Sequence, residues 1–517
     1  MLSKKLKLLL AILPVAFIAQ QSKAQFTLNG QLRDRGEIRE GVGNLVPLGS
    51  KPAAFISQRT RLNFGYQWDR LTFGVSVQDV RVWGQDASTI SNIDVGSRLM
   101  LHEGWADILL VNKDDPSIGF KPIDRLSLKV GRQELIYDDA RLLGNLDWLQ
   151  QGRSFDMALL KAEHKGFQVD VGYAFNQNTD AFNVTNTFYV PGNVPAYIKD
   201  SKGATVPTPG GIVPLAAAGS INNNSSKTGT PIYITPPNTN GGTQDYKSFT
   251  SVHIQKKFDQ TKISGLFFND NFGKYQLDSV ATTNSSYVYG RRFNSSGTNS
   301  RYTYGLIASQ LLGAKASWGN VALQGSVYGQ SGSNRDGANL KAHYYSVMGI
   351  YTKAKISVGP GYDVLSGNNA NTIAAGQDNR FDPLYGTAHK FNGYMDYFYA
   401  GTGSPAGGLD DAYFKFKYTN QNFFFAADYH YFALNQPMKQ ANGAQIGNYL
   451  GSEINLTANY NLSKLTNVEL GYGLMKASNS MSIAKGQAQN TIYNRTGNWF
   501  YLMLNIHPDF FATKTKS

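Results

Sequence analysis

The chain has 517 residues, with 53 glycines, 30 tyrosines and 29 phenylalanines, and a formal net charge of +13. It contains no cysteine, so disulfides and thiolate metal sites are excluded. The basic residues do not form runs and the chain begins like a secreted one, so we expect no nucleic-acid partner.

The first 24 residues have the pattern of a secretory signal. Three lysines, Lys4, Lys5 and Lys7, precede the apolar residues 8–18, and small residues stand at positions 22 and 24. The apolar stretch is shorter than the roughly 20 residues that a membrane helix needs. We expect cleavage after Ala24, which leaves residues 25–517 as one domain.

The stretch after the signal alternates between charged and apolar side chains. Arg33, Arg35, Glu37 and Arg39 fall on odd positions, and Phe26, Leu28 and Leu32 on even ones. Residues 54–68 repeat the pattern, with Arg59 and Arg61 opposite Leu62 and Phe64. A period of two predicts strands with one polar and one apolar face. The parity slips near residues 78–81, where we expect a β-bulge.

The same alternation predicts eighteen strands. They are 26–39, 54–68, 71–83, 98–111, 123–136, 153–164, 167–177, 246–258, 261–269, 301–317, 320–330, 341–353, 355–365, 409–419, 422–432, 451–461, 466–476 and 498–507. Short turns and long polar connections alternate between them, and the longest connection is 177–245. Counting the aromatic stretch 389–400 as a strand would break this rhythm, so we place it in a long loop.

Strands of about 10 to 14 residues are too long for a soluble β-sandwich, whose strands average about 5–6. We therefore predict an all-β fold: a transmembrane antiparallel β-barrel of about 18 strands with short periplasmic turns and long extracellular loops. Such a barrel belongs in the outer membrane of a Gram-negative cell, among outer-membrane lipids. Trp68, Trp318 and Trp499 are expected in the interfacial girdles.

The arginines must then face the lumen. An arginine at the lipid midplane costs about 2–4 kcal/mol, so an outward ladder would cost as much as a domain's stability. A ring of arginines in a pore favours anions, and guanidinium pairs with carboxylate in two-point fashion. The other interpretation is structural, with the ladder neutralised by Glu37 or Asp79.

Residues 128–161 resemble the alginate export family of outer-membrane barrels. The matching pieces are Gly131-Arg132-Gln133-Glu134, Asp139 with Arg141 and Leu142, Gly144-Asn145, Asp147-Trp148 and Gly152-Arg153-Ser154-Phe155-Asp156. The arginine-rich strands and the stretches 389–398 and 407–418 are similar to other parts of that family.

The resemblance implies a barrel of eighteen strands whose lumen is narrowed by inward-folded loops and lined with arginines. It also implies diffusion of an acidic polysaccharide or oligosaccharide, such as an alginate-like uronate, and insertion by the barrel assembly machinery. The implied solute-binding residues are Arg33, Arg35, Arg39, Arg59, Arg61, Arg132 and Arg153, with Glu37, Glu134 and Asp156 as their charge partners. No cofactor and no metal is expected.

Other classes of function remain to be compared. A G-x-S-x-G elbow and an H-E-x-x-H motif are both absent, so we expect no enzyme activity. A plugged active importer would need about 22 strands. A general diffusion porin and a non-conducting adhesin or structural barrel stay open as alternatives.

Overall fold

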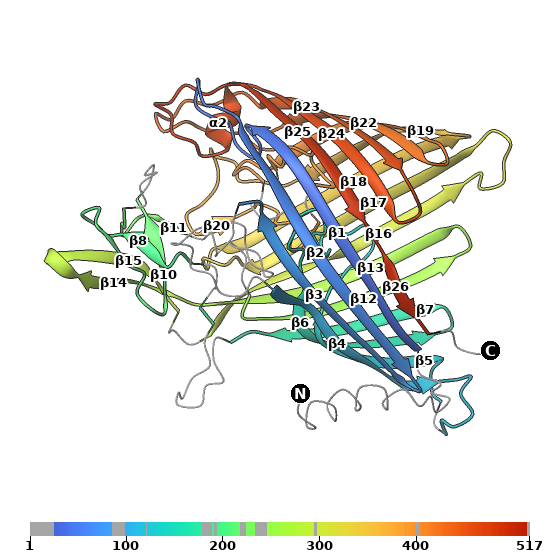
Figure 1. Cartoon of the computed structure of the whole chain (residues 1–517). Helices are drawn as coiled ribbons and strands as arrows, with labels where there is room; N and C mark the ends of the chain where they lie inside the picture. The colour runs from blue at the N-terminus through green and yellow to red at the C-terminus, as the bar shows by residue number, and fades with distance from the viewer. Residues whose placement is uncertain are drawn as a thin grey trace, which may run out of the picture.

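The molecule is a closed antiparallel barrel of 18 strands (Figure 1). The structure is a computed structural model that describes residues 25–84, 99–119, 121–177, 189–190, 194–217, 224–232, 246–293, 297–387, 389–398 and 404–513. Each barrel strand pairs with the next along the chain, and pairing of the first strand with the last closes the ring. None of the helices in these ranges is long and apolar enough to span a membrane.

The barrel strands are 9 to 16 residues long. In order around the ring they are β1 (Gln25–Glu40), β2 (Ala53–Trp68), β3 (Leu71–Val82), β4 (Leu99–Asn112), β5 (Arg125–Gln133), β6 (Phe155–His164), β7 (Phe167–Phe175), β12 (Ser248–Phe258), β13 (Thr261–Gly273), β16 (Thr298–Leu312), β17 (Asn320–Ser333), β18 (Asn339–Lys353), β19 (Ile356–Leu365), β21 (Leu409–Thr419), β22 (Phe423–Ala433), β23 (Tyr449–Asn461), β24 (Thr466–Ala477) and β25 (Thr496–Ile506).

Shorter elements decorate the barrel. They are β8 (Tyr197–Lys199), β9 (Thr205–Pro207), β10 (Ile212–Ala216), β11 (Thr230–Pro231), β14 (Gln276–Thr282), the 3₁₀ turn η2 (Thr283–Ser285), β15 (Ser286–Arg292), β20 (Gln377–Asp378), α2 (Ser480–Ala484) and β26 (Asp509–Ala512). The last of these pairs with the periplasmic half of β1.

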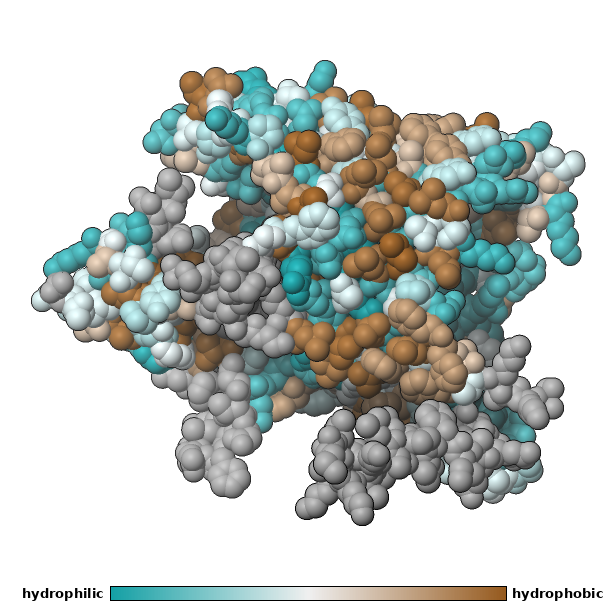
Figure 2. Space-filling model, in the orientation of Figure 1, coloured by the Kyte–Doolittle hydropathy of each residue, from teal (hydrophilic) through white to brown (hydrophobic). Residues whose placement is uncertain are grey.

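Alternation along the strands produces an apolar outside and a polar inside. On β16 and β18 the outward Leu306 and Val347 are more than half exposed, whereas the inward Thr303 and Ser346 are buried. A hydrophobic zone covers much of the visible barrel wall in Figure 2. Exposed leucine and valine side chains are stable there because they meet lipid rather than water.

All eighteen predicted strands are confirmed, with ends shifted by a few residues. The aromatic stretch after residue 388 is loop over its described residues, as expected from the rhythm of turns. The bulge lies slightly away from its predicted place, because the register shifts between Ser76 and Val77, opposite an extra residue, His102, on β4.

Two expectations about the tryptophans hold and one is wrong. Trp68 and Trp318 are exposed on the outer surface near the short turns. Trp499 is only 2 % exposed and points inward, where its Nε1 donates to Glu37. The alternation of β25 places the side chain of Trp499 inside, together with Tyr501.

The connection 177–245, expected to be a long loop, contains short strands. Its described residues contain β8 to β11, and β10 joins β11 and the β14–β15 hairpin in a four-stranded sheet. Ile198, Ile212 and Val288 form a small core of their own. This external sheet projects from the long-loop end of the barrel in Figure 1.

Candidate solute pathway

Two external loops fold into the barrel and pair with each other. One is 134–154, between β5 and β6, and the other is 366–408, between β19 and β21. The amide of Gly144 donates to the carbonyl of Tyr385 over 3.0 Å, and the amide of Tyr385 donates to the carbonyl of Leu142 over 2.9 Å. Apolar side chains of both loops join inward wall residues in one buried cluster. The lumen is therefore narrowed by inward loops.

The predicted arginine ladder points inward but does not line open water. The exposed fractions of Arg33, Arg35 and Arg59 are 4 %, 2 % and 1 %. Loop 134–154 lies over them. Asp147 accepts from Arg59 Nη1 over 2.8 Å and from Arg33 Nη1 over 3.4 Å, and Gln150 Oε1 accepts from Arg33 Nε over 2.9 Å. These three arginines hold the loop in place.

The arginines that hold loop 134–154 also shift the pKa of the Asp147 carboxyl. Burial acts to raise the pKa of its carboxyl, but the positive charges of Arg59 and Arg33 outweigh that effect, so its pKa lies below the usual value. The carboxylate therefore stays charged and bound to the ladder at neutral pH.

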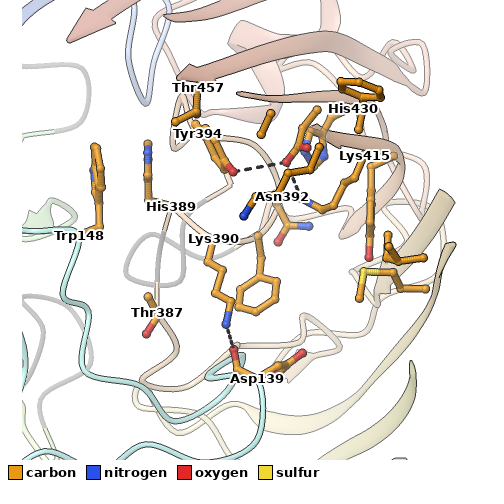
Figure 3. Close-up of a pocket in the computed structure, with 18 of the residues that line it drawn as sticks. Asp139, Trp148, Thr387, His389, Lys390, Asn392, Tyr394, Lys415, His430 and Thr457 are labelled. Atoms are coloured by element: carbon orange, nitrogen blue, oxygen red, sulfur yellow. Dashed lines mark hydrogen bonds and ion pairs between the residues drawn. The ribbon is translucent and has the colours of Figure 1, made fainter. Parts of the chain in front are cut away.

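A column of stacked groups connects the wall to both loops. The guanidinium of Arg35 lies 4.2 Å from the ring centroid of Trp148, and its Nη1 donates to the carbonyl of Trp148 over 2.9 Å. The imidazole of His389 stacks on the other side of the indole at 3.9 Å, and Tyr394 follows at 4.7 Å. Figure 3 shows Trp148 and His389 lying parallel. Each contact of this kind contributes about 0.5–1.5 kcal/mol.

Glu37 is buried between two arginines. It accepts from Arg35 Nε over 2.9 Å and from Arg39 Nε over 2.7 Å. The side chain of Arg39 remains 34 % exposed. Glu37 thus orients the external end of the ladder, and Arg39 is its most accessible member on β1.

The other inward residues of the predicted set also have protein partners. Arg61 donates to Gln78 Oε1 over 2.7 Å and 3.0 Å. Arg153 donates to the carbonyls of Tyr385 and Gly386 in the second loop. Glu134 accepts from Asn145 over 2.9 Å and lies 2.9 Å from His102 Nε2. Arg153 therefore fastens the first loop to the second, and Glu134 connects the first loop to His102 on the wall, whereas Arg61 and Gln78 are both wall residues.

Arg132 and Asp156 do not lie in the lumen, and Asp79 does not neutralise the ladder. Arg132 and Asp156 are cross-strand neighbours. Their side chains lie on the same outward face as Leu128 and Leu160. They form a two-point ion pair at 2.9 Å and 2.7 Å near the external rim. Asp79 also faces outward. Strand parity, which motif matching ignores, decides these positions.

A cavity of about 770 Å³ opens between the paired loops and the opposite wall, β17 to β25. Figure 3 shows part of its lining. Aromatic side chains provide much of the surface, and the charged lining residues are Asp139, Arg141, Asp363, Lys390, Lys415, Lys417, Asp428 and Glu469. The lining has as many acidic as basic side chains, so the charge that a solute meets depends on which of them are exposed.

The most exposed charges in this cavity are positive, whereas Glu469 is partly buried and accepts a hydrogen bond from Tyr501. Arg141 and Asp363 are buried against each other, and Lys415 pairs with the buried Asp428 over 2.5 Å. Lys390 and Lys417 are exposed. Lys390 Nζ donates to the carbonyl of Asp139 over 2.6 Å.

The ammonium of Lys417 lies over an aromatic ring, 4.4 Å from the ring centroid of Phe424. Among the described residues, neither Lys390 nor Lys417 has a carboxylate within ion-pair distance. Both ammonium groups can therefore meet a solute.

Sequence reasoning did not single out these lysines, although a signal existed. Lys415 and Lys417 share the polar face of a strand that alternates cleanly, so their inward direction was readable. Lys390 lies in loop 366–408, whose fold no periodicity reveals. In the described ranges no group of three or more His, Asp or Glu side chains has the geometry of a metal site.

A closed barrel with apolar walls, short periplasmic turns and inward-folded external loops is a transmembrane β-barrel of the outer membrane. Solved structures share this architecture. OccAB4 of Acinetobacter baumannii is similar with a TM-score of 0.55 and 12% identity, over 95% of this chain and 99% of that chain. OprD of Pseudomonas aeruginosa gives 0.52 and 11%, over 94% and 96%.

The family model for alginate export matches residues 30–176. The matched residues include the 128–161 block, so the resemblance seen there is confirmed. None of the curated proteins matches the chain.

Proposed function

We propose that this porin gives passive, anion-selective passage to an acidic saccharide, an alginate-like uronate oligomer or polymer. The observation that carries the proposal is the pair of exposed ammonium groups, Lys390 and Lys417, in the cavity. Three of the four lining carboxylates, Asp139, Asp363 and Asp428, are ion-paired with cations of the lining, and the fourth, Glu469, is partly buried and accepts a hydrogen bond from Tyr501. A fixed positive charge in a pore favours anions.

The cavity also suits a saccharide in shape and chemistry. Phe391, Tyr394 and Phe424 line the cavity and are partly exposed, so they supply apolar surface to a solute. A uronate ring carries apolar C–H faces and one carboxylate. It can lie along the aromatic side while its carboxylate meets an ammonium group.

The arginine ladder has a different part in this proposal from the one expected. Arg33, Arg35 and Arg59 position the loop that shapes the cavity. Arg39, which is partly exposed near the external end of β1, remains a candidate for weak contact with the solute, whereas the mid-strand Arg61 is only 11 % exposed.

The test is planar-bilayer recording of the purified porin. In a salt gradient, the reversal potential of the wild type should show preference for chloride over potassium. Alginate oligomers should reduce the current, and a neutral glucan of equal length should reduce it less. Equal block by both glycans would favour a general diffusion porin, and absence of current would favour a structural barrel.

A double variant tests whether Lys390 and Lys417 cause the preference for anions. Lys390→Gln with Lys417→Gln should shift the reversal potential toward zero and weaken block by the uronate. The matched control is Lys113→Gln with Lys353→Gln, because these lysines lie at short periplasmic turns outside the cavity. An equal shift in both double variants would contradict the assignment.

A further inference from the structure

A polar patch interrupts the apolar outer surface of β1 to β3. We call it the polar window, and its members are Asp34, Gln58, Thr60, Asp79 and Arg81. Alternation places these side chains on the outer face, because the inward residues between them are Arg33, Arg59 and Gln78. Figure 2 shows hydrophilic surface between two hydrophobic zones over these strands.

Apolar side chains surround the polar window above and below. On the periplasmic side the next outward residues are Leu62 and Val77, which are cross-strand partners. On the external side they are Ile56 and Trp83, joined by the hydrogen bond from Trp83 N to the carbonyl of Ile56. Trp83 is exposed on the outer surface. The window therefore lies within the apolar band, below its external limit.

The neighbouring strands are apolar at the same height. Asp34 pairs in register with Leu504 of β25, and Asp79 pairs with Leu99 of β4. Leu504 and Leu99 are both exposed to the outside. Charged side chains at this depth face hydrocarbon unless another surface covers them, and such exposure is costly.

The window satisfies most of its own hydrogen-bonding groups. Arg81 Nε pairs with Asp79 Oδ2 over 2.5 Å. Trp83 Nε1 donates to Gln58 Oε1 over 2.8 Å, and Gln58 Nε2 donates to Thr60 Oγ1 over 3.1 Å. Asp34 differs, because its Oδ1 is buried without a hydrogen-bond partner among the described residues. The Asp34 side chain as a whole is only partly buried, so a second surface can still contact it.

The geometry of the window is self-complementary. Asp34, Gln58 and Arg81 form one cross-strand row, with the carboxylate at one end and the guanidinium at the other. A two-fold axis along the membrane normal through Gln58 would bring Asp34 of one copy to Arg81 of the second copy, and the reverse. Arg81 would then join two carboxylates, Asp79 and Asp34 of the other copy.

Close approach is possible beside the carboxylate. Gly36 faces outward next to Asp34, and a Cβ at Gly36 would meet only Ile56 at 3.8 Å and the carbonyl of Leu502 at 4.0 Å. Small residues and polar side chains are the features that join protein surfaces in lipid, where apolar burial gives no driving force.

An anionic lipid headgroup fits the window less well. The window has two carboxylates and one guanidinium, so its formal charge is negative and repels phosphate. We propose that this outer face of β1 to β3 binds a second copy of the chain, forming a two-fold dimer in the outer membrane. The proposal is independent of the solute that the porin carries.

Cysteine cross-linking in intact outer membranes tests the dimer. The chain has no cysteine, so Thr60→Cys introduces a single thiol near the proposed axis. Mild oxidation should give disulfide-linked dimers. Val347→Cys, on the outward face of β18 at the other side of the ring, is the matched control and should stay monomeric. Equal cross-linking of both, or none at Thr60, would overturn the proposal.

Charge exchange in the Thr60→Cys background tests the contact itself. Asp34→Lys should reduce the dimer yield about tenfold, because it opposes two cations. Adding Arg81→Glu should restore the dimer, since the two ends of the row are exchanged. Gly36→Leu should also reduce the yield without any change of charge.

Heat-modifiable migration on gels confirms that each barrel has folded. Folded Asp34→Lys that dimerises like the parent, or a double variant that stays monomeric, would contradict the two-fold geometry. A window occupied only by lipid would leave all these variants monomeric.

Discussion

Trp148 and His389 stack face to face, with ring centroids 3.9 Å apart and ring planes inclined by 10°. This contact joins the two inward loops. Arg35 covers the opposite face of the indole, so one aromatic column links the barrel wall to both loops. The width of the pathway therefore depends on a few contacts between distant parts of the chain.

The first prediction concerns this column. Trp148→Ala should loosen the loops by about 0.5–1.5 kcal/mol for each lost stacking contact. Single-channel recordings should show larger and noisier currents, while the barrel remains folded. Trp318→Ala, on the outer surface, is the control and should leave the conductance unchanged. Identical currents from both variants would mean that the column does not limit the pathway.

The second prediction is a pH dependence of loop docking. Burial acts to raise the pKa of the Asp147 carboxyl, but the positive charges of Arg59 and Arg33 lower it by more. Its pKa in the folded protein therefore lies below the usual value. A carboxyl with a lowered pKa contributes stability that is complete above its ordinary pKa and is lost as pH falls through the folded value.

Conductance should therefore be steady from neutral pH down to about pH 4 and become larger and noisier below it. The measurement is single-channel recording across this range. Asp147→Asn should be noisy at every pH. A wild-type current that loosens near neutrality would point to another titrating group.

The third prediction concerns the anchor on the wall. Arg59→Ala removes the donors that meet Asp147 and Gln31 and leaves a buried gap. We expect unfolding in urea to become easier by about 3 kcal/mol. Arg70→Ala, at a short turn where it pairs with Asp115, is the control and should change stability by about 0.5 kcal/mol or less. Equal stability of the two variants would contradict the anchoring role of Arg59.

The fourth prediction tests the pairing of the loops. A Cβ at Gly144 would overlap Thr387 Oγ1 and lie 2.9 Å from Ala140 Cβ. Gly144→Ala should separate the loops at a cost of about 1–3 kcal/mol. Protease cleavage within 134–154 should become faster, and Thr387→Ala should recover part of the protection. Unchanged cleavage would mean that the loops tolerate the methyl group.

The strands, and therefore the barrel, could be predicted from residue order. Successive side chains of a strand point to opposite faces, so the alternation of residues such as Arg33 and Leu32 reports a polar inside and an apolar outside. Turn lengths then gave the strand count and the orientation. The same rule, applied strand by strand, places Lys415 and Lys417 inside and Arg132 outside.

The candidate site could be predicted only in part. The alternation of side chains shows that Arg33, Arg35 and Arg59 face inward. Their burial depends on Asp147, Trp148 and Gln150, which belong to a loop 88 to 117 positions away in the chain. No local pattern records such a contact.

Residue order by itself determined which face of each strand meets lipid and which meets the lumen, because that depends on a local two-residue period. The tertiary structure alone decided which inward charges remain open to a solute. Lys390 and Lys417 stay accessible while the arginine ladder is covered, since long-range folding of the loops brings carboxylates to the arginines and leaves the lysines beside a cavity.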